Sequence, residues 1–105
     1  METPLLKIDS IRRCLTRVSE MASLNPTFSD QNALDVTILN LQRACEQALD
    51  LANWVCAYRN LSVPRTSREV FTILENAGIL SPLLATNMRR MIGFRNIAIH
   101  EYQKN

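Results

Sequence analysis

Side chains that could do acid–base chemistry beside an anion gather in the run FRNIAIHEY, residues 94–102. His100 is the only histidine in the sequence, and an imidazole titrates near neutral pH, so it can act as a general acid or base. Arg95 carries a guanidinium that can stabilise negative charge through paired N–H bonds. Asn96 lies four residues before His100, so the two would share one face of a helix. The run could therefore move a proton beside a negatively charged group.

Each of these residues also has an ordinary structural explanation. A single histidine in a small domain usually lies at the surface or makes a structural hydrogen bond. An arginine near the edge of a core usually extends its charge into solvent or forms an ion pair, and Tyr102 would pack with its hydroxyl in water. The combination of all these residues within eight positions favours a functional site over the separate explanations.

These residues would be positioned by a helix that begins near Ser81 and Pro82. Proline suits the first helical position because its missing N–H needs no partner there. At about 100° per residue, one group of side chains falls within roughly 60° of a single direction. This apolar stripe comprises Leu84, Met88, Met91, Ile92, Ile99 and Tyr102. Arg95 falls about 20° from its centre. Because a buried charge without a partner is costly, this conflict marks a candidate functional site.

The opposite side of the same helix is apolar as well, since it carries Phe94 and Ile97. A helix that is apolar nearly all round is buried on several sides. In a chain of 105 residues, a second copy of the chain is the expected source of the additional cover. The sequence therefore predicts a homodimer.

Two longer helices precede this one. The first is predicted to begin at Pro4 with Thr3 as its cap, and the second to be capped by Ser29 or Asp30. Apolar positions three and four residues apart predict one buried stripe on each. The first stripe is Leu5, Ile8, Ile11, Leu15, Val18 and Ala22. The second stripe is Leu34, Ile38, Leu41, Cys45, Ala48, Ala52 and Val55. The strict alternation in the second helix indicates the seam of a helical bundle.

A short helix completes the predicted set of elements. Thr66 followed by Glu69 is a capping box that would open it, and Gly78 would end it. Only two glycines and 6% aromatic residues argue against a β fold, which needs more of both. With 47% hydrophobic and 21% charged residues, the chain is expected to fold as an all-α helical bundle.

Composition excludes several classes of protein. A net charge of +2 is too small to establish nucleic-acid binding by itself. Cys14, Cys45 and Cys56 lack the spacing of a metal knuckle, so they are expected to be buried thiols, with no metal and no cofactor. No apolar stretch approaches the roughly 20 residues of a membrane span. The N-terminus lacks the layout of a signal peptide, so a cytoplasmic location is expected.

The run 94–102 resembles the signature of the HEPN superfamily, in which an arginine and a polar residue precede a histidine by a few positions. Four positions separate Arg95 from His100, and Tyr102, two residues after the histidine, resembles the tyrosine of the HepT-like toxins. Residues 39–53 and 67–77 are similar to two further helices of that family. The resemblance implies that residues 1–105 form a single domain, an antiparallel bundle of four or five helices. Members of the family usually continue past the tyrosine into a further helix, which residues 1–105 would lack.

The resemblance also implies an activity, that of a metal-independent endoribonuclease toxin from a toxin–antitoxin pair. Its substrate would be RNA, whose 2′-hydroxyl attacks the adjacent phosphate. His100 would move the proton and Arg95 would stabilise the phosphate charge, while Asn96 would orient the imidazole or hold a phosphate oxygen. Because Arg95 and His100 lie about 140° apart around one helix, the expected site is a composite cleft between the two copies of a homodimer.

By the same resemblance, Tyr102 would accept AMP from a partner, an MNT-type nucleotidyltransferase antitoxin. Arg95 and Tyr102 are seven residues apart and so lie on one helical stripe. A nucleotide on Tyr102 would place phosphate beside Arg95 and exclude the phosphate of the substrate.

Two alternatives stay open at this point. The chain could be a non-catalytic helical subunit that docks on a nucleotidyltransferase and uses Arg95 and His100 only to bind nucleotide or RNA. It could also be a structural bundle in which Arg95 pairs with Glu46 or Asp50. The first alternative predicts that His100→Ala changes binding rather than turnover, and the second predicts a surface without a cleft around residues 95–102.

Overall fold

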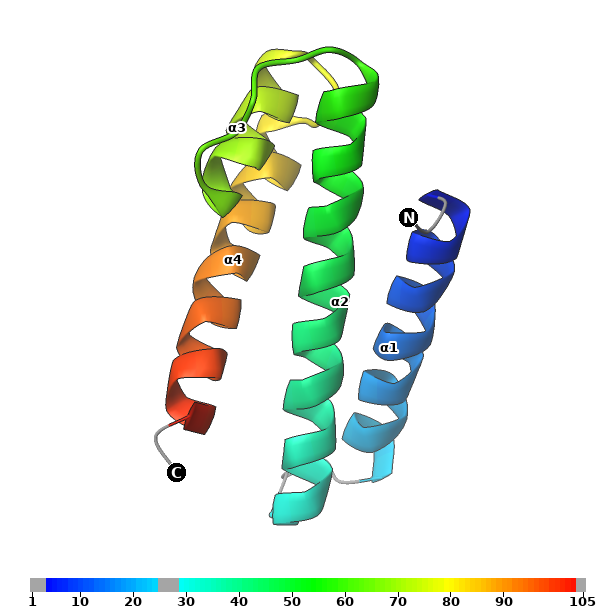
Figure 1. The fold of residues 1–105 in the computed structure, drawn as a ribbon. Coiled ribbons are helices and arrows are strands. Elements are labelled where there is room, and N and C mark those ends of the chain that lie inside the picture. The colour runs from blue at the N-terminus through cyan, green and yellow to red at the C-terminus, as the bar shows by residue number, and fades with distance from the viewer. Residues whose placement is uncertain (1–3, 25–28, 104–105) are drawn as a thin grey trace. The chain divides into compact units, whose positions relative to one another are not determined.

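The computed structural model describes residues 4–24 and 29–103, and for Ile99 and residues 101–103 it describes the backbone only. These residues form four helices (Figure 1). They are α1 (Pro4–Leu24), α2 (Gln31–Tyr58), α3 (Ser67–Asn76) and α4 (Pro82–Gln103). No strand occurs in this part of the chain, so the predicted all-α fold is confirmed.

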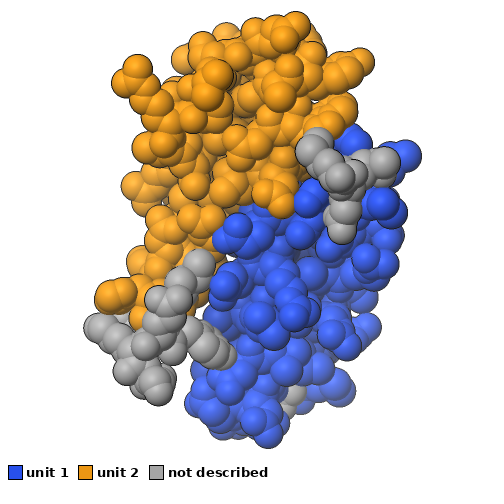
Figure 2. Space-filling view, viewed as in Figure 1, with its two compact units in different colours: residues 1–48 blue, residues 49–105 orange. Residues whose placement is uncertain are grey.

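Packing divides the chain into two compact units, Met1–Ala48 and Leu49–Asn105, with the boundary inside α2 (Figure 2). Unit 1 contains α1 and the first part of α2. Unit 2 contains the last turns of α2 together with α3 and α4. The residues singled out for chemistry all belong to α4 and therefore to unit 2. The single domain predicted over residues 1–105 stays a prediction.

The core of unit 2 forms where the last turns of α2 meet α3 and α4. Its buried members are Leu49, Ala52, Cys56, Val70, Phe71, Leu74 and Ile92. Phe71 and Ile92 are each only 1% exposed, and full burial of such a side chain contributes about 1.5–3 kcal/mol. A helix of ten residues such as α3 is marginal on its own in water. This packing therefore stabilises α3 and holds α4 against it.

Local signals set the ends of α3 and the start of α4 as predicted. The Thr66 hydroxyl accepts a hydrogen bond of 3.1 Å from the Glu69 N–H, while the Glu69 carboxylate accepts one of 3.4 Å from the N–H of Arg65 rather than from that of Thr66. Gly78 adopts φ +74° just beyond the end of α3, a backbone conformation that glycine tolerates best. At the start of α4, Ser81 Oγ accepts a hydrogen bond of 3.2 Å from the Leu84 N–H.

The starts of the two longer helices also agree with their predicted signals. Helix α1 begins at Pro4, and the expected cap Thr3 lies outside the described residues. At the start of α2, the carboxylate of the candidate cap Asp30 accepts a hydrogen bond of 3.0 Å from the Asn32 N–H.

The predicted apolar stripes were partly wrong, because they favour large side chains. In α4, Ala85 is 0% exposed whereas Leu84, which was assigned to the core, is 46% exposed. In α1, Cys14 is buried whereas Leu15 is 48% exposed. The buried set of α2 is Ala33, Thr37, Asn40, Ala44, Cys45, Leu49, Ala52 and Cys56. Small side chains on a contact face let neighbouring helices approach closely, and a ranking by hydrophobicity does not select them.

The three cysteines are buried and unbridged, as predicted. Burial raises the pKa of the Cys56 thiol, because desolvation penalises the thiolate. Cys56 is 2% exposed within the core of unit 2, so it acts there as a small apolar side chain. Across the described residues, no helix is both long enough and apolar enough to cross a membrane.

Candidate functional site

The C-terminal turns of α4 carry all the residues that sequence analysis proposed for chemistry. Asn96 and His100 are exposed, and Arg95 is half-buried. Arg95 follows Ile92, which is 1% exposed, and precedes Ala98, which is 9% exposed. The arginine thus lies between two buried positions of α4, which agrees with its predicted position near the centre of the apolar stripe.

Arg95 and Asn96 are joined by two hydrogen bonds at this end of the helix. The Asn96 side-chain oxygen accepts hydrogen bonds from Arg95 Nε at 3.2 Å and from Arg95 Nη2 at 2.8 Å. Two donors on one edge of the guanidinium are therefore engaged by one acceptor. A planar guanidinium held along one edge has a defined orientation, and Asn96 supplies that constraint from the adjacent position.

The contact with Arg95 adds to the role expected for Asn96, which stays a prediction. From the sequence, Asn96 is expected to orient the imidazole of His100 or to hold a phosphate oxygen. In the structure its oxygen serves Arg95, which leaves the amide nitrogen Nδ2 as the donor that can meet a phosphate oxygen. The helical spacing still places Asn96 and His100 on one face of α4. Asn96 therefore links the arginine to the face that carries the histidine.

One residue near this face was not selected from the sequence. A Cβ atom added at Gly93 would lie 2.9 Å from Arg68 Nη2, so the guanidinium of Arg68 rests against the backbone of α4. The contact joins residues of two different helices, so spacing along α4 cannot reveal it. The available signal was Gly93 itself, since a glycine inside a helix is unfavourable without a packing or functional reason.

Two other predicted features lie at this end of α4. Tyr102 belongs to the helical backbone of α4, but its side chain is outside the described part, so its assignment stays a prediction. Phe94 and Ile97 are 42% and 66% exposed, as expected for the side of the helix that a second copy would cover. The ion pair of Arg95 with Glu46 or Asp50 stays an alternative prediction.

The sequence model of the family described as "Ribonuclease HepT-like" matches residues 6–104. The chain belongs to the HepT-like ribonuclease family. The resemblance recognised in residues 94–102 is thereby confirmed at the level of the family.

Relatives of this HepT-like chain are a named nuclease and a toxin in complex with its antitoxin. The mRNA nuclease HepT of Shewanella oneidensis is 38% identical over 99 residues, which cover 93% of this chain and 74% of the relative. A solved structure of a tri-AMPylated HEPN toxin from Shewanella oneidensis, in complex with MNT antitoxin, matches with a TM-score of 0.90 at 36% identity. That match covers 97% of this chain and 78% of the other chain.

A second solved structure, a toxin–antitoxin with AMP-PNP, matches with a TM-score of 0.89 at 36% identity. It likewise covers 97% of this chain and 78% of the other. The HepT-like fold of this chain therefore follows that of solved relatives over almost its whole length.

Proposed function

We propose that this HepT-like chain is the toxin of a toxin–antitoxin pair and cleaves RNA without a metal ion. The observation that carries the proposal is the Arg95–Asn96 contact on the helix that also exposes His100. Membership of the ribonuclease family and the relative called an mRNA nuclease support RNA as the substrate class. Because that class includes messenger RNA, the expected compartment is the cytoplasm.

The proposed reaction uses the 2′-hydroxyl of RNA as its nucleophile. His100 removes the hydroxyl proton, the 2′-oxygen forms a bond to phosphorus, and the bond from phosphorus to the 5′-oxygen breaks. A proton passes to that 5′-oxygen, so the products are a 2′,3′-cyclic phosphate and a 5′-hydroxyl. Arg95 stabilises the charge that builds up on the phosphate oxygens. Asn96 holds the guanidinium in place for this role.

We further propose that the cleft is shared between two copies of the chain. Arg95 and His100 lie about 140° apart around α4, so the two side chains of one copy point too far apart to contact the same phosphate. The exposed side chains of Phe94 and Ile97 offer apolar surface for a twofold contact at the same end of the helix. In such a dimer, Arg95 of one copy meets His100 of the other.

The test of cleavage uses single-stranded RNA in excess EDTA. Wild-type protein is expected to cut the RNA and leave 2′,3′-cyclic phosphate ends, and His100→Ala is expected to lower the rate by about 10²–10⁴-fold, the usual contribution of acid–base catalysis. Circular dichroism and binding of the same RNA serve as controls for folding and affinity. If the wild-type protein binds RNA but never cuts it, the chain is a non-catalytic binding subunit and not a ribonuclease.

The shared cleft is tested by mixing two inactive variants. Arg95→Ala and His100→Ala are refolded together and assayed beside each variant alone. A mixed dimer keeps one cleft with both residues, so partial recovery of cleavage is expected. No recovery, with mixed dimers shown by mass spectrometry, would place Arg95 and His100 of one cleft in the same chain.

We also propose an MNT-type nucleotidyltransferase as the antitoxin, with Tyr102 as the acceptor of AMP. The solved relative in complex with MNT antitoxin is tri-AMPylated, and another relative was solved as a toxin–antitoxin complex carrying a tyrosine-to-alanine substitution. The test incubates the chain with ATP and such an enzyme. Tyr102→Phe is expected to retain cleavage and to lose modification, with Tyr58→Phe as the matched control. If Tyr102→Phe is still fully modified, another residue accepts AMP and the assignment of Tyr102 is wrong.

A further inference from the structure

We infer that Arg68 of α3 is a second phosphate-binding residue for the RNA strand. Its guanidinium lies against the face of α4 that carries Asn96 and His100. This inference rests on the proposed ribonuclease function, and it names a contact to a phosphate other than the scissile one. It is carried by the contact between Arg68 and Gly93, by the register of α4, and by the lack of a carboxylate within ion-pair distance of Arg68 among the residues that the structure describes.

The contact with Gly93 gives the Arg68 guanidinium its position. Arg68 belongs to α3, and its Nη2 atom lies 2.9 Å from the place that a Cβ of residue 93 would occupy. Glycine within a helix is about 1 kcal/mol less favourable than alanine. At this position it leaves room for the guanidinium to lie against α4. The Arg68 guanidinium therefore explains why a glycine occupies position 93.

The register of α4 places this guanidinium on the face of the helix that carries Asn96 and His100. Asn96 is three residues and His100 seven residues beyond Gly93, and such spacings lie on one side of a helix. At about 1.5 Å of rise per residue, Gly93 and His100 are separated by about 10 Å along the axis. A charge at the level of Gly93 is therefore too far along the helix for the phosphate beside His100. It suits a neighbouring phosphate of the same strand.

A comparison with Arg89 shows why Arg68 is available for a ligand. Arg89 lies one turn before Gly93 on the same face, but its Nη1 is bound to the Glu75 carboxylate at 3.0 Å and to the Thr72 hydroxyl at 3.2 Å. Arg68 is exposed, and no carboxylate of the described residues lies within ion-pair distance of it. Its paired N–H donors match the oxygens of a phosphate.

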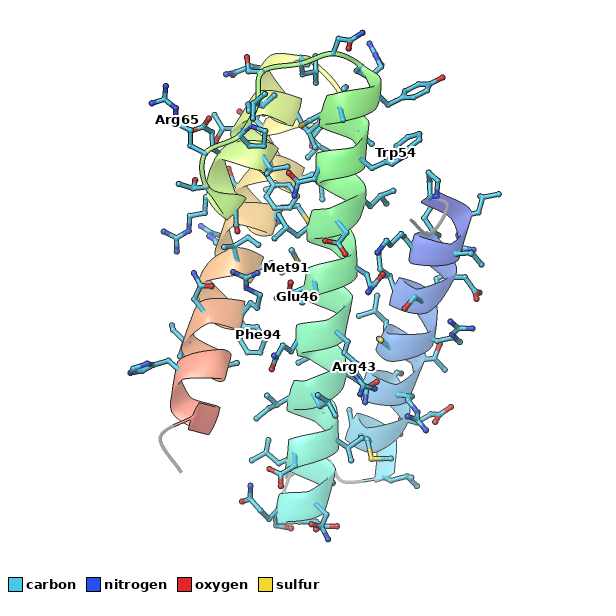
Figure 3. All side chains as sticks on the ribbon, viewed as in Figure 1. Arg43, Glu46, Trp54, Arg65, Met91 and Phe94 are labelled. Atoms are coloured by element: carbon cyan, nitrogen blue, oxygen red, sulfur yellow. The ribbon has the colours of Figure 1, made fainter. Side chains whose placement is uncertain are left out.

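The first test measures RNA binding in a His100→Ala background, so that no substrate is consumed. Each phosphate contact on a single strand contributes about 0.7 to the slope of log affinity against log salt. Adding Arg68→Ala is expected to lower affinity by about tenfold, as for one charged hydrogen-bonding group, and to reduce that slope by about 0.7. The matched control is Arg65→Ala. Arg65 is exposed in the segment before α3, and its side chain extends outward from the ribbon (Figure 3).

The second test displaces the guanidinium without removing it. Gly93→Ala puts a methyl group against the flexible end of Arg68, which must then shift. We expect Gly93→Ala to reproduce part of the loss seen in Arg68→Ala, and the double variant to lose no more than Arg68→Ala alone. A purely structural role for Arg68 would instead lower thermal stability and leave the salt slope unchanged.

These outcomes separate the inference from the function on which it rests. If wild-type protein cleaves RNA while Arg68→Ala keeps the parental affinity and salt slope, the phosphate contact of Arg68 is wrong and the ribonuclease stands. The same conclusion follows if Arg65→Ala and Arg68→Ala lower affinity equally, because net charge alone then explains the loss. If wild-type protein neither binds nor cleaves RNA, the proposed function fails and the inference fails with it.

Discussion

The two halves of α4 differ in how their side chains are satisfied. Residues 85–92 bury Ala85 and Ile92 in unit 2 and tie Arg89 to Glu75 at 3.0 Å. Residues 94–100 instead expose Phe94, Ile97 and His100. One continuous helix thus combines a half that is packed within its own unit with a half that presents apolar and titratable groups outward. The packed half can hold the other half rigid while that half meets another molecule.

A matched pair of isoleucines gives the largest expected difference between the halves. Ile92→Ala is expected to lower the free energy of unfolding by about 2–5 kcal/mol, because it leaves a cavity in a core. Ile97, which is 66% exposed, should lose less than about 1 kcal/mol on the same substitution. Urea denaturation followed by circular dichroism, at a protein concentration low enough to keep the chain monomeric, measures both. Equal losses would show that the second half is packed as tightly as the first.

One arginine from each half of α4 tests the same comparison, since Arg89 should affect mainly stability and Arg95 mainly cleavage. Arg89→Ala removes a partly buried ion pair and should lower stability by about 1 kcal/mol with cleavage by the folded protein unchanged. Arg95→Ala should lower the cleavage rate by about 10²-fold or more while the unfolding midpoint changes little. Thermal unfolding and RNA cleavage are measured on both variants. A loss of cleavage in Arg89→Ala equal to that in Arg95→Ala would extend the functional half toward the N-terminus of α4.

The smallest expected effect is on the orientation of Arg95. Asn96→Ala removes the acceptor for two Arg95 N–H donors, so the guanidinium loses a constraint and cleavage should fall by about tenfold. Asn87→Ala, another exposed asparagine of α4, is the control. The measurement is kcat/KM on single-stranded RNA. Unchanged kcat/KM in Asn96→Ala would mean that Arg95 is positioned by its other contacts.

The cysteine of the unit 2 core reports on the packed half in a separate way. Burial raises the pKa of Cys56, and the thiolate is the species that reacts, so alkylation of the folded protein should be slow and should rise only at more alkaline pH than for a free thiol. Ile92→Ala should accelerate alkylation of Cys56 by opening its core, whereas Ile97→Ala should not. Peptide mapping by mass spectrometry resolves this site. Fast alkylation in wild-type protein would contradict the buried position.

Local signals predicted the ends of the helices well because each acts over a few residues. Thr66 caps α3, Gly78 ends it and Ser81 precedes α4, all as expected from residue type and spacing. The family resemblance also rested on a short run, residues 94–102, and the match over residues 6–104 confirmed it. The buried faces were predicted less well, since Ala85 is buried and Leu84 exposed. Burial depends on what packs against a helix, which its own sequence does not contain.

The sequence alone determined the helical class, the helix boundaries and the run that carries Arg95, Asn96 and His100, because these depend on backbone propensities and on periodicity along one chain. Only the tertiary structure decided which side chains fill the core of unit 2, that Asn96 binds Arg95, and that Arg68 of α3 lies against Gly93 of α4. The Asn96 contact depends on side-chain rotamers, and the Arg68 contact joins residues 25 positions apart in the sequence. Both are set by how side chains pack in three dimensions rather than by their spacing along the chain.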